Sequence, residues 1–156
     1  MKSVLYLFVL TMFSLSINTQ AKDFYVGEIS DTKILESFAK FKKHEHDVSY
    51  SAEQLKKLKQ FDQPVEVKVY FGQWCHDSQR EVPRLLKLFK QLDQDNFKVW
   101  YYGVDIQKSD PLGLAKADNL RKTPTVIIYR QGKEIGRILE VPRVDWASDI
   151  AAILGQ

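Results

Sequence analysis

The fold is decided by residues 65–92, which read VEVKVYFGQWCHDSQREVPRLLKLFKQL. The first eight residues begin by alternating apolar and polar side chains and end wholly apolar, a pattern typical of a strand entering a buried region. After a short turn, apolar residues recur at the three- and four-residue spacing of an amphipathic helix. We therefore predict a strand over 65–72 and a helix over 78–92, kinked at Pro83.

Strand and helix patterns also flank this stretch. In chain order we expect a strand over 24–29, a helix from Asp31, a helix after the capping box Ser51–Gln54, a strand over 97–104, a short helix from Asp110, a hairpin of strands 125–129 and 134–139, and a helix over 144–154. Alternating elements followed by a hairpin predict an α/β fold, in which a central mixed β-sheet is flanked by helices on both faces.

Length and composition fit one globular domain. The chain has 156 residues, of which 44% are apolar and 28% charged, so it can bury a core and is not a disordered chain. The formal net charge of +3 is only a mild excess of basic residues. Nucleic-acid binding needs a clustered basic stripe, so we expect no nucleic-acid partner. A single Cys excludes a disulfide framework.

The first residues have the pattern of a secretory signal peptide. Lys2 precedes an apolar run over 4–15, and a small-x-small ending closes at Ala21. The apolar run is shorter than a bilayer span, so we expect cleavage after Ala21 and no stable membrane insertion thereafter. The predicted organisation is a signal peptide over 1–21, an N-terminal strand and helical segment over 22–64, and the main domain over 65–156. Export to the periplasm is favoured over the extracellular space.

Cys75 is the candidate reactive residue, because a lone Cys in an exported chain cannot form an internal disulfide. It lies at a strand-to-helix turn, where free backbone N–H groups and the helix dipole favour a thiolate. His76 would add positive charge when protonated, Asp77 would oppose it, and the Ser78 hydroxyl can donate a hydrogen bond to the sulfur. The alternatives are a buried inert thiol, a solvent-facing His76 and a Ser78 that only caps the helix.

The segment Trp74–Ser78 resembles the Trp-Cys-x-x-Cys site of the thioredoxin superfamily, with Ser in place of the second Cys. Further landmarks occur in the family's order over residues 65–154. They are Pro83 in the active-site helix, Val104-Asp105, Asp110-Pro111, Thr123-Pro124-Thr125 at the place of the cis-proline loop, Gly132-Lys133 and Gly136. The resemblance implies a thioredoxin-like fold.

The resemblance also implies a function and a substrate site. Thr123 would pair its backbone with an extended substrate, Pro124 would keep the backbone close to Cys75, and Trp74 would form an apolar lip beside the sulfur. The implied activity is monothiol-type thiol–disulfide exchange, in which Cys75 forms mixed disulfides that an external thiol resolves. The partners would be protein or low-molecular-weight thiols and disulfides. Glutathione is a candidate external thiol, and no other cofactor is expected.

Two departures from the family keep other functions open. The second Cys of the family's motif, which resolves the mixed disulfide within the same chain, is absent. The second departure is Val69, which occupies the position where the family often has a buried acidic residue. One alternative is a non-catalytic binding module or chaperone for extended polypeptides, and another is a peroxide sensor that forms a sulfenic acid at Cys75.

His44-Glu45-His46 belongs to a solvated, lysine-rich helix end, so no metal site is expected. The oligomeric state is not predicted.

Overall fold

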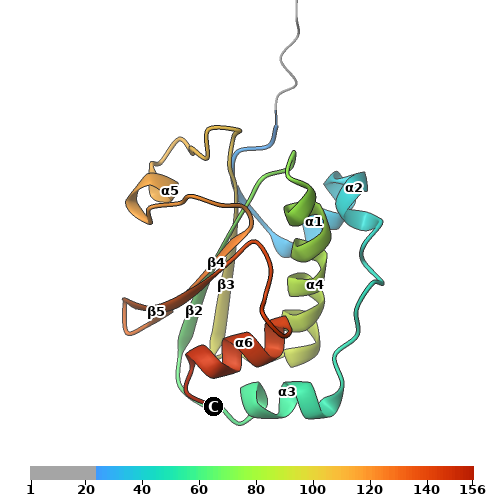
Figure 1. Cartoon of the computed structure of the whole chain (residues 1–156), viewed down its shortest axis with the longest axis vertical. Coiled ribbons are helices and arrows are strands. Elements are labelled where there is room, and N and C mark those ends of the chain that lie inside the picture. The colour runs from blue at the N-terminus through green and yellow to red at the C-terminus, as the bar shows by residue number, and fades with distance from the viewer. Residues whose placement is uncertain (1–23) are drawn as a thin grey trace, which may run out of the picture.

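A five-stranded mixed sheet forms the centre of the molecule (Figure 1). The structure, a computed structural model, describes residues 24–156, and the predicted signal peptide lies outside the described residues. The sheet order is β1-β3-β2-β4-β5, with only β2 and β3 parallel. The strands are β1 (Gly27–Ile29), β2 (Val65–Phe71), β3 (Phe97–Gly103), β4 (Thr125–Arg130) and β5 (Lys133–Leu139). The predicted mixed sheet is confirmed.

Helices lie on both faces of this sheet, as predicted, but very unequally. The helices are α1 (Asp31–Ser37), α2 (Ala39–Lys42), α3 (Ala52–Lys59), α4 (His76–Leu92), α5 (Leu114–Ala117) and α6 (Trp146–Ile153). Figure 1 shows α4 and α6 on one side of the sheet and α5 on the other. The larger core packs against the first side, and a small cluster of Tyr70, Val104, Ala115 and Ile127 lies under α5.

The expected helix from Asp31 is broken into two pieces at Phe38. This residue has extended backbone angles, φ −120° and ψ 91°, and separates α1 from α2. Its ring packs 5.4 Å from that of Phe41 and 6.1 Å from that of Phe71, measured between centroids. Burial of three aromatic rings against the end of β2 therefore overrides the continuous helical pattern of the sequence.

Three other helix starts differ from the prediction, of which that of α6 lies at Trp146, two residues later than expected. Helix α4 begins at His76, two residues earlier than expected, and its N-cap is Cys75. Helix α5 begins only at Leu114, because the Asp110 carboxylate accepts backbone N–H groups across the intervening turn, including those of Leu112 and Ala115. Asp110 therefore organises the turn that leads into the helix.

A buried carboxylate joins α4 to α6. Glu81 is only 2% exposed and accepts a hydrogen bond of 2.9 Å from the indole N–H of Trp146. Its other oxygen accepts from Arg80 at 2.7 Å and from Arg84 at 3.2 Å. These contacts compensate the carboxylate for its loss of water and fix α6 against the active-site helix.

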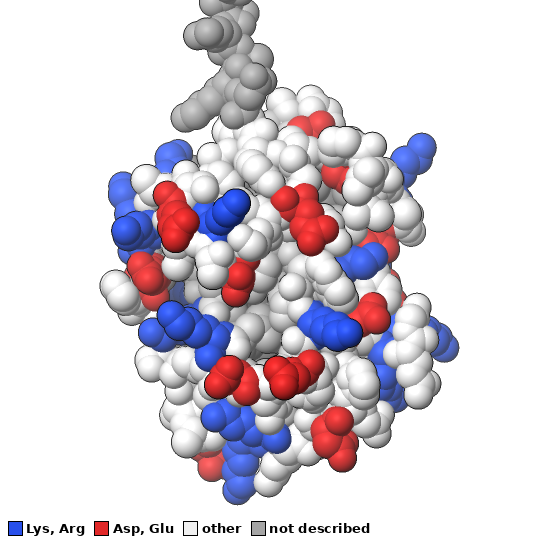
Figure 2. All heavy atoms as spheres, turned by 180° about the vertical axis from the view of Figure 1, so that it is seen from behind, with Lys and Arg blue, Asp and Glu red and all other residues white. Residues whose placement is uncertain are grey.

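The surface carries basic and acidic side chains in close alternation over the face shown in Figure 2. Across residues 24–156, no helix has both the length and the apolar character needed to cross a membrane.

Candidate active site

Cys75 lies where the central strand β2 gives way to α4. As the N-cap residue it has extended backbone angles, and its carbonyl accepts the N–H of Gln79 at 2.9 Å. The side chain is half-buried, and its sulfur donates a hydrogen bond to the carbonyl oxygen of Thr123 at 3.0 Å. The only thiol of the chain is therefore accessible and touches a loop that lies 48 residues further along the sequence.

The loop opposite the sulfur contains the Thr123–Pro124 peptide bond, which is cis. Pro124 is tied to the chain beyond β5, because its carbonyl accepts the N–H of Glu140 at 2.7 Å. The Thr125 hydroxyl donates to the carbonyl of Lys122 at 2.8 Å. Thr123 is only 3% exposed, and within the described part of the chain its N–H has no hydrogen-bond acceptor.

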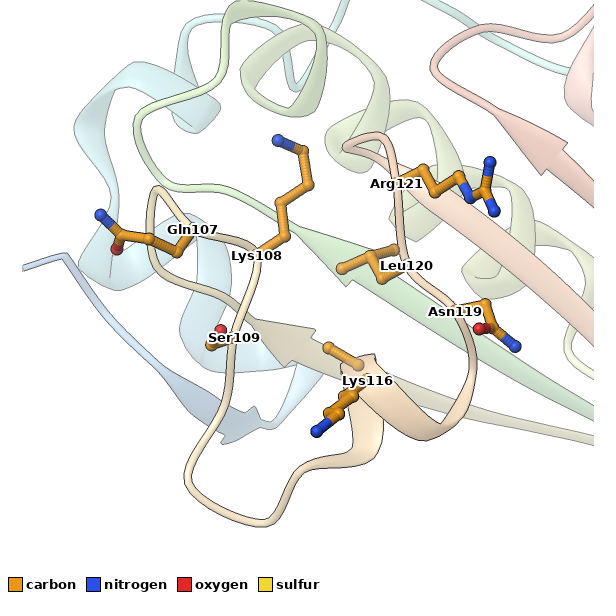
Figure 3. A pocket seen from close by; sticks show the side chains of 8 residues that line it. Gln107, Lys108, Ser109, Lys116, Asn119, Leu120 and Arg121 are labelled. Carbon is orange, nitrogen blue, oxygen red and sulfur yellow. The ribbon is translucent and has the colours of Figure 1, made fainter.

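Trp74, the residue before Cys75, is held by three neighbours. Its indole N–H donates to the carbonyl of Val104 at 3.3 Å. Its ring lies over Gly72, where a Cβ atom would stand 2.7 Å from the nearest ring carbon, so a larger residue would displace the ring. The Lys108 ammonium lies 5.7 Å from the ring centroid, a cation–π arrangement. Figure 3 shows Lys108 in the lining of an adjacent pocket.

Ser78 does not make the contact with the sulfur that the sequence suggested, and His76 faces solvent. Ser78 is fully buried, and its hydroxyl oxygen accepts the N–H of Gly72 at 3.1 Å. Among residues 24–156 no hydrogen bond joins it to the Cys75 sulfur. It therefore ties the end of β2 to the first turn of α4. His76 is exposed, in agreement with the solvent-facing alternative.

The N-terminal segment reaches the active-site loop through Gln73. The side-chain oxygen of Gln73 accepts the backbone N–H of Tyr25 at 2.8 Å, and its carbonyl accepts from the Gln79 side chain at 2.9 Å. The segment before β2 thus supports the loop that carries Cys75. No periodicity or motif in the sequence connects these residues, which lie 48 positions apart.

In the region 24–156, no group of three or more His, Cys, Asp or Glu side chains is arranged to hold a metal ion. In the His44 segment, the ring of His44 forms a hydrogen bond with Asp47 at 2.6 Å.

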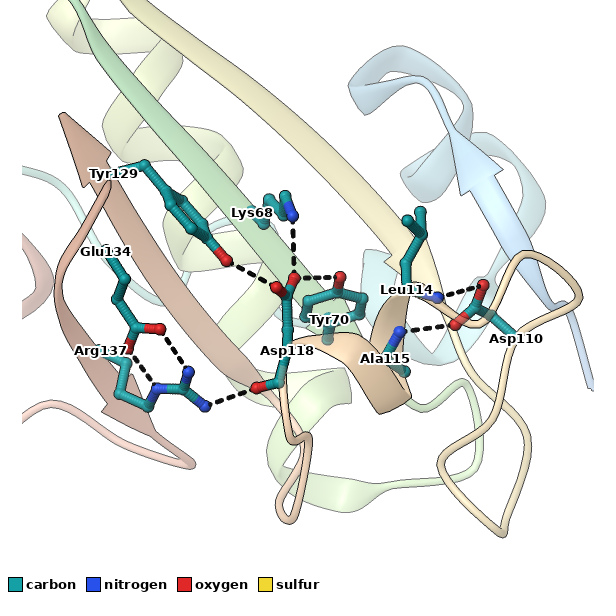
Figure 4. Close-up of polar contacts among 9 residues, drawn as sticks. All are labelled: Lys68, Tyr70, Asp110, Leu114, Ala115, Asp118, Tyr129, Glu134 and Arg137. Carbon is teal, nitrogen blue, oxygen red and sulfur yellow. Dashed lines mark hydrogen bonds and ion pairs between the residues drawn. The ribbon is translucent and has the colours of Figure 1, made fainter. Parts of the chain in front are cut away.

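Asp118 anchors the segment that leads to Thr123 (Figure 4). One carboxylate oxygen accepts hydrogen bonds from Lys68 at 2.9 Å and from Tyr70 at 2.6 Å, and the other accepts from Tyr129 at 2.8 Å. Burial raises the pKa of Asp118, but these hydrogen bonds and the Lys68 charge outweigh burial and hold the pKa below its usual value. The cluster joins the end of α5 to strands β2 and β4.

Substitution Asp118→Asn should lower the free energy of unfolding at pH 7 by about 2–3 kcal/mol. The folded-state pKa lies below the unfolded value of about 3.9, so the carboxylate stabilises the fold above that pH. This contribution is lost as the pH falls through the lowered pKa. Urea unfolding between pH 7 and pH 2 should show the difference between wild type and variant shrinking. The exposed control Asp95→Asn should change little, and a gap that stays constant would contradict the assignment.

A thiol at the start of a helix, facing a cis-proline loop on a mixed sheet, defines a thioredoxin-fold protein with a single-thiol site. A family model described as Thioredoxin matches residues 28–148. The chain therefore belongs to the thioredoxin family. A comparison with curated proteins gives no match.

Similar solved structures come from several organisms. A protein of unknown function from Pseudomonas aeruginosa has a TM-score of 0.55 at 16% identity, covering 80% of this chain and 84% of its own. Trxlp from Edwardsiella tarda has a TM-score of 0.46 at 23% identity, with coverages of 67% and 94%. Oxidised thioredoxin O2 from Arabidopsis thaliana has a TM-score of 0.45 at 19% identity, with coverages of 67% and 86%.

Proposed function

We propose that this protein carries out thiol–disulfide exchange through Cys75 alone, with an external thiol completing each cycle. The observation that carries the proposal is the position of the sulfur. It is half-buried at the beginning of α4 and 3.0 Å from the Thr123 carbonyl, beside a cis-proline loop in a member of the thioredoxin family. The proposed setting is the periplasm, after export.

The proposed reaction has two exchange steps. In the first, the Cys75 thiolate attacks one sulfur of a disulfide, a Cys75–substrate disulfide forms, the original sulfur–sulfur bond breaks, and the other sulfur leaves as a thiolate. In the second, the thiolate of an external thiol attacks the substrate sulfur of the mixed disulfide and releases Cys75 as a thiolate. The external thiol is oxidised, the leaving sulfur is reduced, and Cys75 is regenerated. Glutathione is the proposed external thiol.

The loop opposite Cys75 suits an extended polypeptide. The unpaired N–H of Thr123 offers one backbone hydrogen bond to a substrate chain. Beyond the Glu140–Pro124 hydrogen bond, Val141 remains 45% exposed and provides apolar surface near the loop. These features also favour a second candidate function, in which the same loop holds unfolded chains without redox turnover.

Substitution of Cys75 tests the proposed activity. Wild-type protein should reduce a peptide–glutathione mixed disulfide when glutathione is supplied, because the glutathione sulfur of the substrate is first transferred to Cys75 and the peptide leaves as a thiolate. Free glutathione then attacks the Cys75–glutathione disulfide and releases glutathione disulfide. Both Cys75→Ser, which nearly preserves the side-chain shape, and Cys75→Ala should lower the rate to that of glutathione alone. Mass spectrometry of wild type after acid quenching should detect the Cys75 mixed disulfide. A Cys75→Ala protein that retains the catalysed rate would contradict the proposal.

Binding measurements separate the two candidate functions. If wild type and Cys75→Ala bind an unfolded, Cys-free peptide equally well and neither accelerates disulfide exchange, the protein is a binding module. If exchange requires Cys75, the peptide contacts serve the reaction.

A further inference from the structure

A cationic pocket lies beside the Cys75 site (Figure 3). It has a volume of about 300 Å³ and lies between the loop that follows β3 and the segment that follows α5. Its lining includes Lys108, Lys116 and Arg121, together with the polar side chains of Gln107, Ser109 and Asn119. No acidic residue lines it. This lining contrasts with the mixed charges over the face shown in Figure 2.

The nearby carboxylates already have other partners. Asp105 accepts the N–H of Ser109 at 2.8 Å, Asp110 accepts three backbone N–H groups around the start of α5, and Asp118 is occupied by Lys68 and two tyrosines. Across the described part of the chain, no ion pair involves any of the three pocket cations. The three cations are therefore free to attract an anionic ligand to this side of the molecule.

Two of these cations lie on segments that contact the Cys75 site. The ammonium of Lys108 lies 5.7 Å from the ring centroid of Trp74, the residue next to Cys75. Arg121 lies two residues before Thr123, whose carbonyl accepts from the Cys75 sulfur. In Figure 3 the Lys108 side chain extends upward and the Arg121 side chain extends to the right, away from Lys108, while Lys116 extends downward.

The Lys108 side of the pocket is held in place by its turn. Lys108 has a positive φ of 61°, and its N–H donates to the carbonyl of Asp105 at 2.9 Å. Its side chain is half-buried against Trp74, so the charge is fixed beside the lip of the site.

We infer that the charges of Lys108 and Arg121, on two segments that contact the site, act as a cationic subsite through which Cys75 reacts preferentially with anionic thiols and disulfides. This inference rests on the proposed function, because it assigns a substrate class to the same thiol. Each cation attracts a carboxylate that lies near the attacked sulfur, and the attraction is partly screened by solvent and salt. The carboxylate can belong to glutathione or to an acidic side chain beside a protein disulfide.

Alkylation tests the subsite without requiring disulfide turnover. Iodoacetate carries a carboxylate and iodoacetamide does not, and both alkylate the same sulfur, so the ratio of their rates reports charge preference. The double variant Lys108→Gln/Arg121→Gln should lower the iodoacetate-to-iodoacetamide ratio by about three- to tenfold at low salt, and less at 1 M salt. The control Lys133→Gln removes one charge at the hairpin turn, away from the site, and should leave the ratio unchanged.

An unchanged ratio in the double variant, or an equal fall in the Lys133→Gln control, would overturn the subsite. The ratio remains measurable if Cys75 proves unable to sustain exchange, so failure of the proposed function is distinguishable from failure of this inference. Exchange with glutathione disulfide and with a Glu-flanked peptide disulfide then identifies the source of the carboxylate. The double variant should slow whichever of these two reactions uses the subsite. Its rate of exchange with a Gln-flanked peptide disulfide, the reference reaction, should fall less. If it slows neither, the inference is wrong.

Discussion

Ser78→Cys is expected to convert the single-thiol site into one that resolves its own mixed disulfides. Residues three apart on a helix have Cβ atoms about 5–6 Å apart, close to the roughly 3.5–4.5 Å that a disulfide requires. The Ser78 side chain is buried and points toward the end of β2, where its oxygen contacts the Gly72 N–H. A thiol there would attack the Cys75 mixed disulfide intramolecularly. We expect the mixed disulfide to disappear at least about a hundredfold faster than in wild type without external thiol.

The measurement starts from the purified Cys75–glutathione mixed disulfide and follows the release of glutathione in thiol-free buffer. Wild type should retain glutathione for the duration of the assay. The matched control is Ser78→Ala, which also removes the acceptor of the Gly72 N–H, at a cost of about 1–3 kcal/mol in stability, but adds no thiol. A folded Ser78→Cys protein that releases glutathione as slowly as Ser78→Ala would show that the two side chains cannot meet.

Glu81→Ala should lower the free energy of unfolding by about 3–5 kcal/mol. The substitution would leave the buried Trp146 indole N–H without its acceptor, and would remove the shared carboxylate partner of Arg80 and Arg84. Because domains of this size are stable by only about 5–15 kcal/mol, such a loss brings the protein close to unfolding at moderate temperature. Helix α6 should detach first, since this contact fixes it to α4.

Urea unfolding followed by Trp fluorescence and by far-ultraviolet circular dichroism would measure this loss. Glu81→Gln keeps the shape and an acceptor oxygen for Trp146 while removing the charge, so it should cost less than Glu81→Ala. Glu36 is exposed on α1, and Glu36→Ala should change stability by less than about 0.5 kcal/mol. A Glu81→Ala protein within 1 kcal/mol of wild type would mean that the buried network contributes little net stability.

The sequence by itself determined the order and type of the principal elements. Strand β2 and helix α4 follow from hydrophobic periods of two and 3.6 residues, which are local properties of the chain. The capping box at Ser51 is equally local, and the structure contains it as predicted. The placement of Cys75 at the end of a central strand, and of Thr123-Pro124 before the hairpin, also required only the order of these patterns.

Only the tertiary structure decided which groups meet at the site. The contacts of Cys75 with Thr123, of Gln73 with Tyr25 and of Asp118 with Tyr70 each join residues 48 positions apart. Sequence periodicity carries no information about such pairs, because they depend on how the sheet register brings distant loops together. The same holds for Ser78, whose hydroxyl bonds to the buried Gly72 N–H and not to the sulfur. A buried N–H without an acceptor costs more than a thiol contact gains, and this difference sets the direction of the Ser78 side chain.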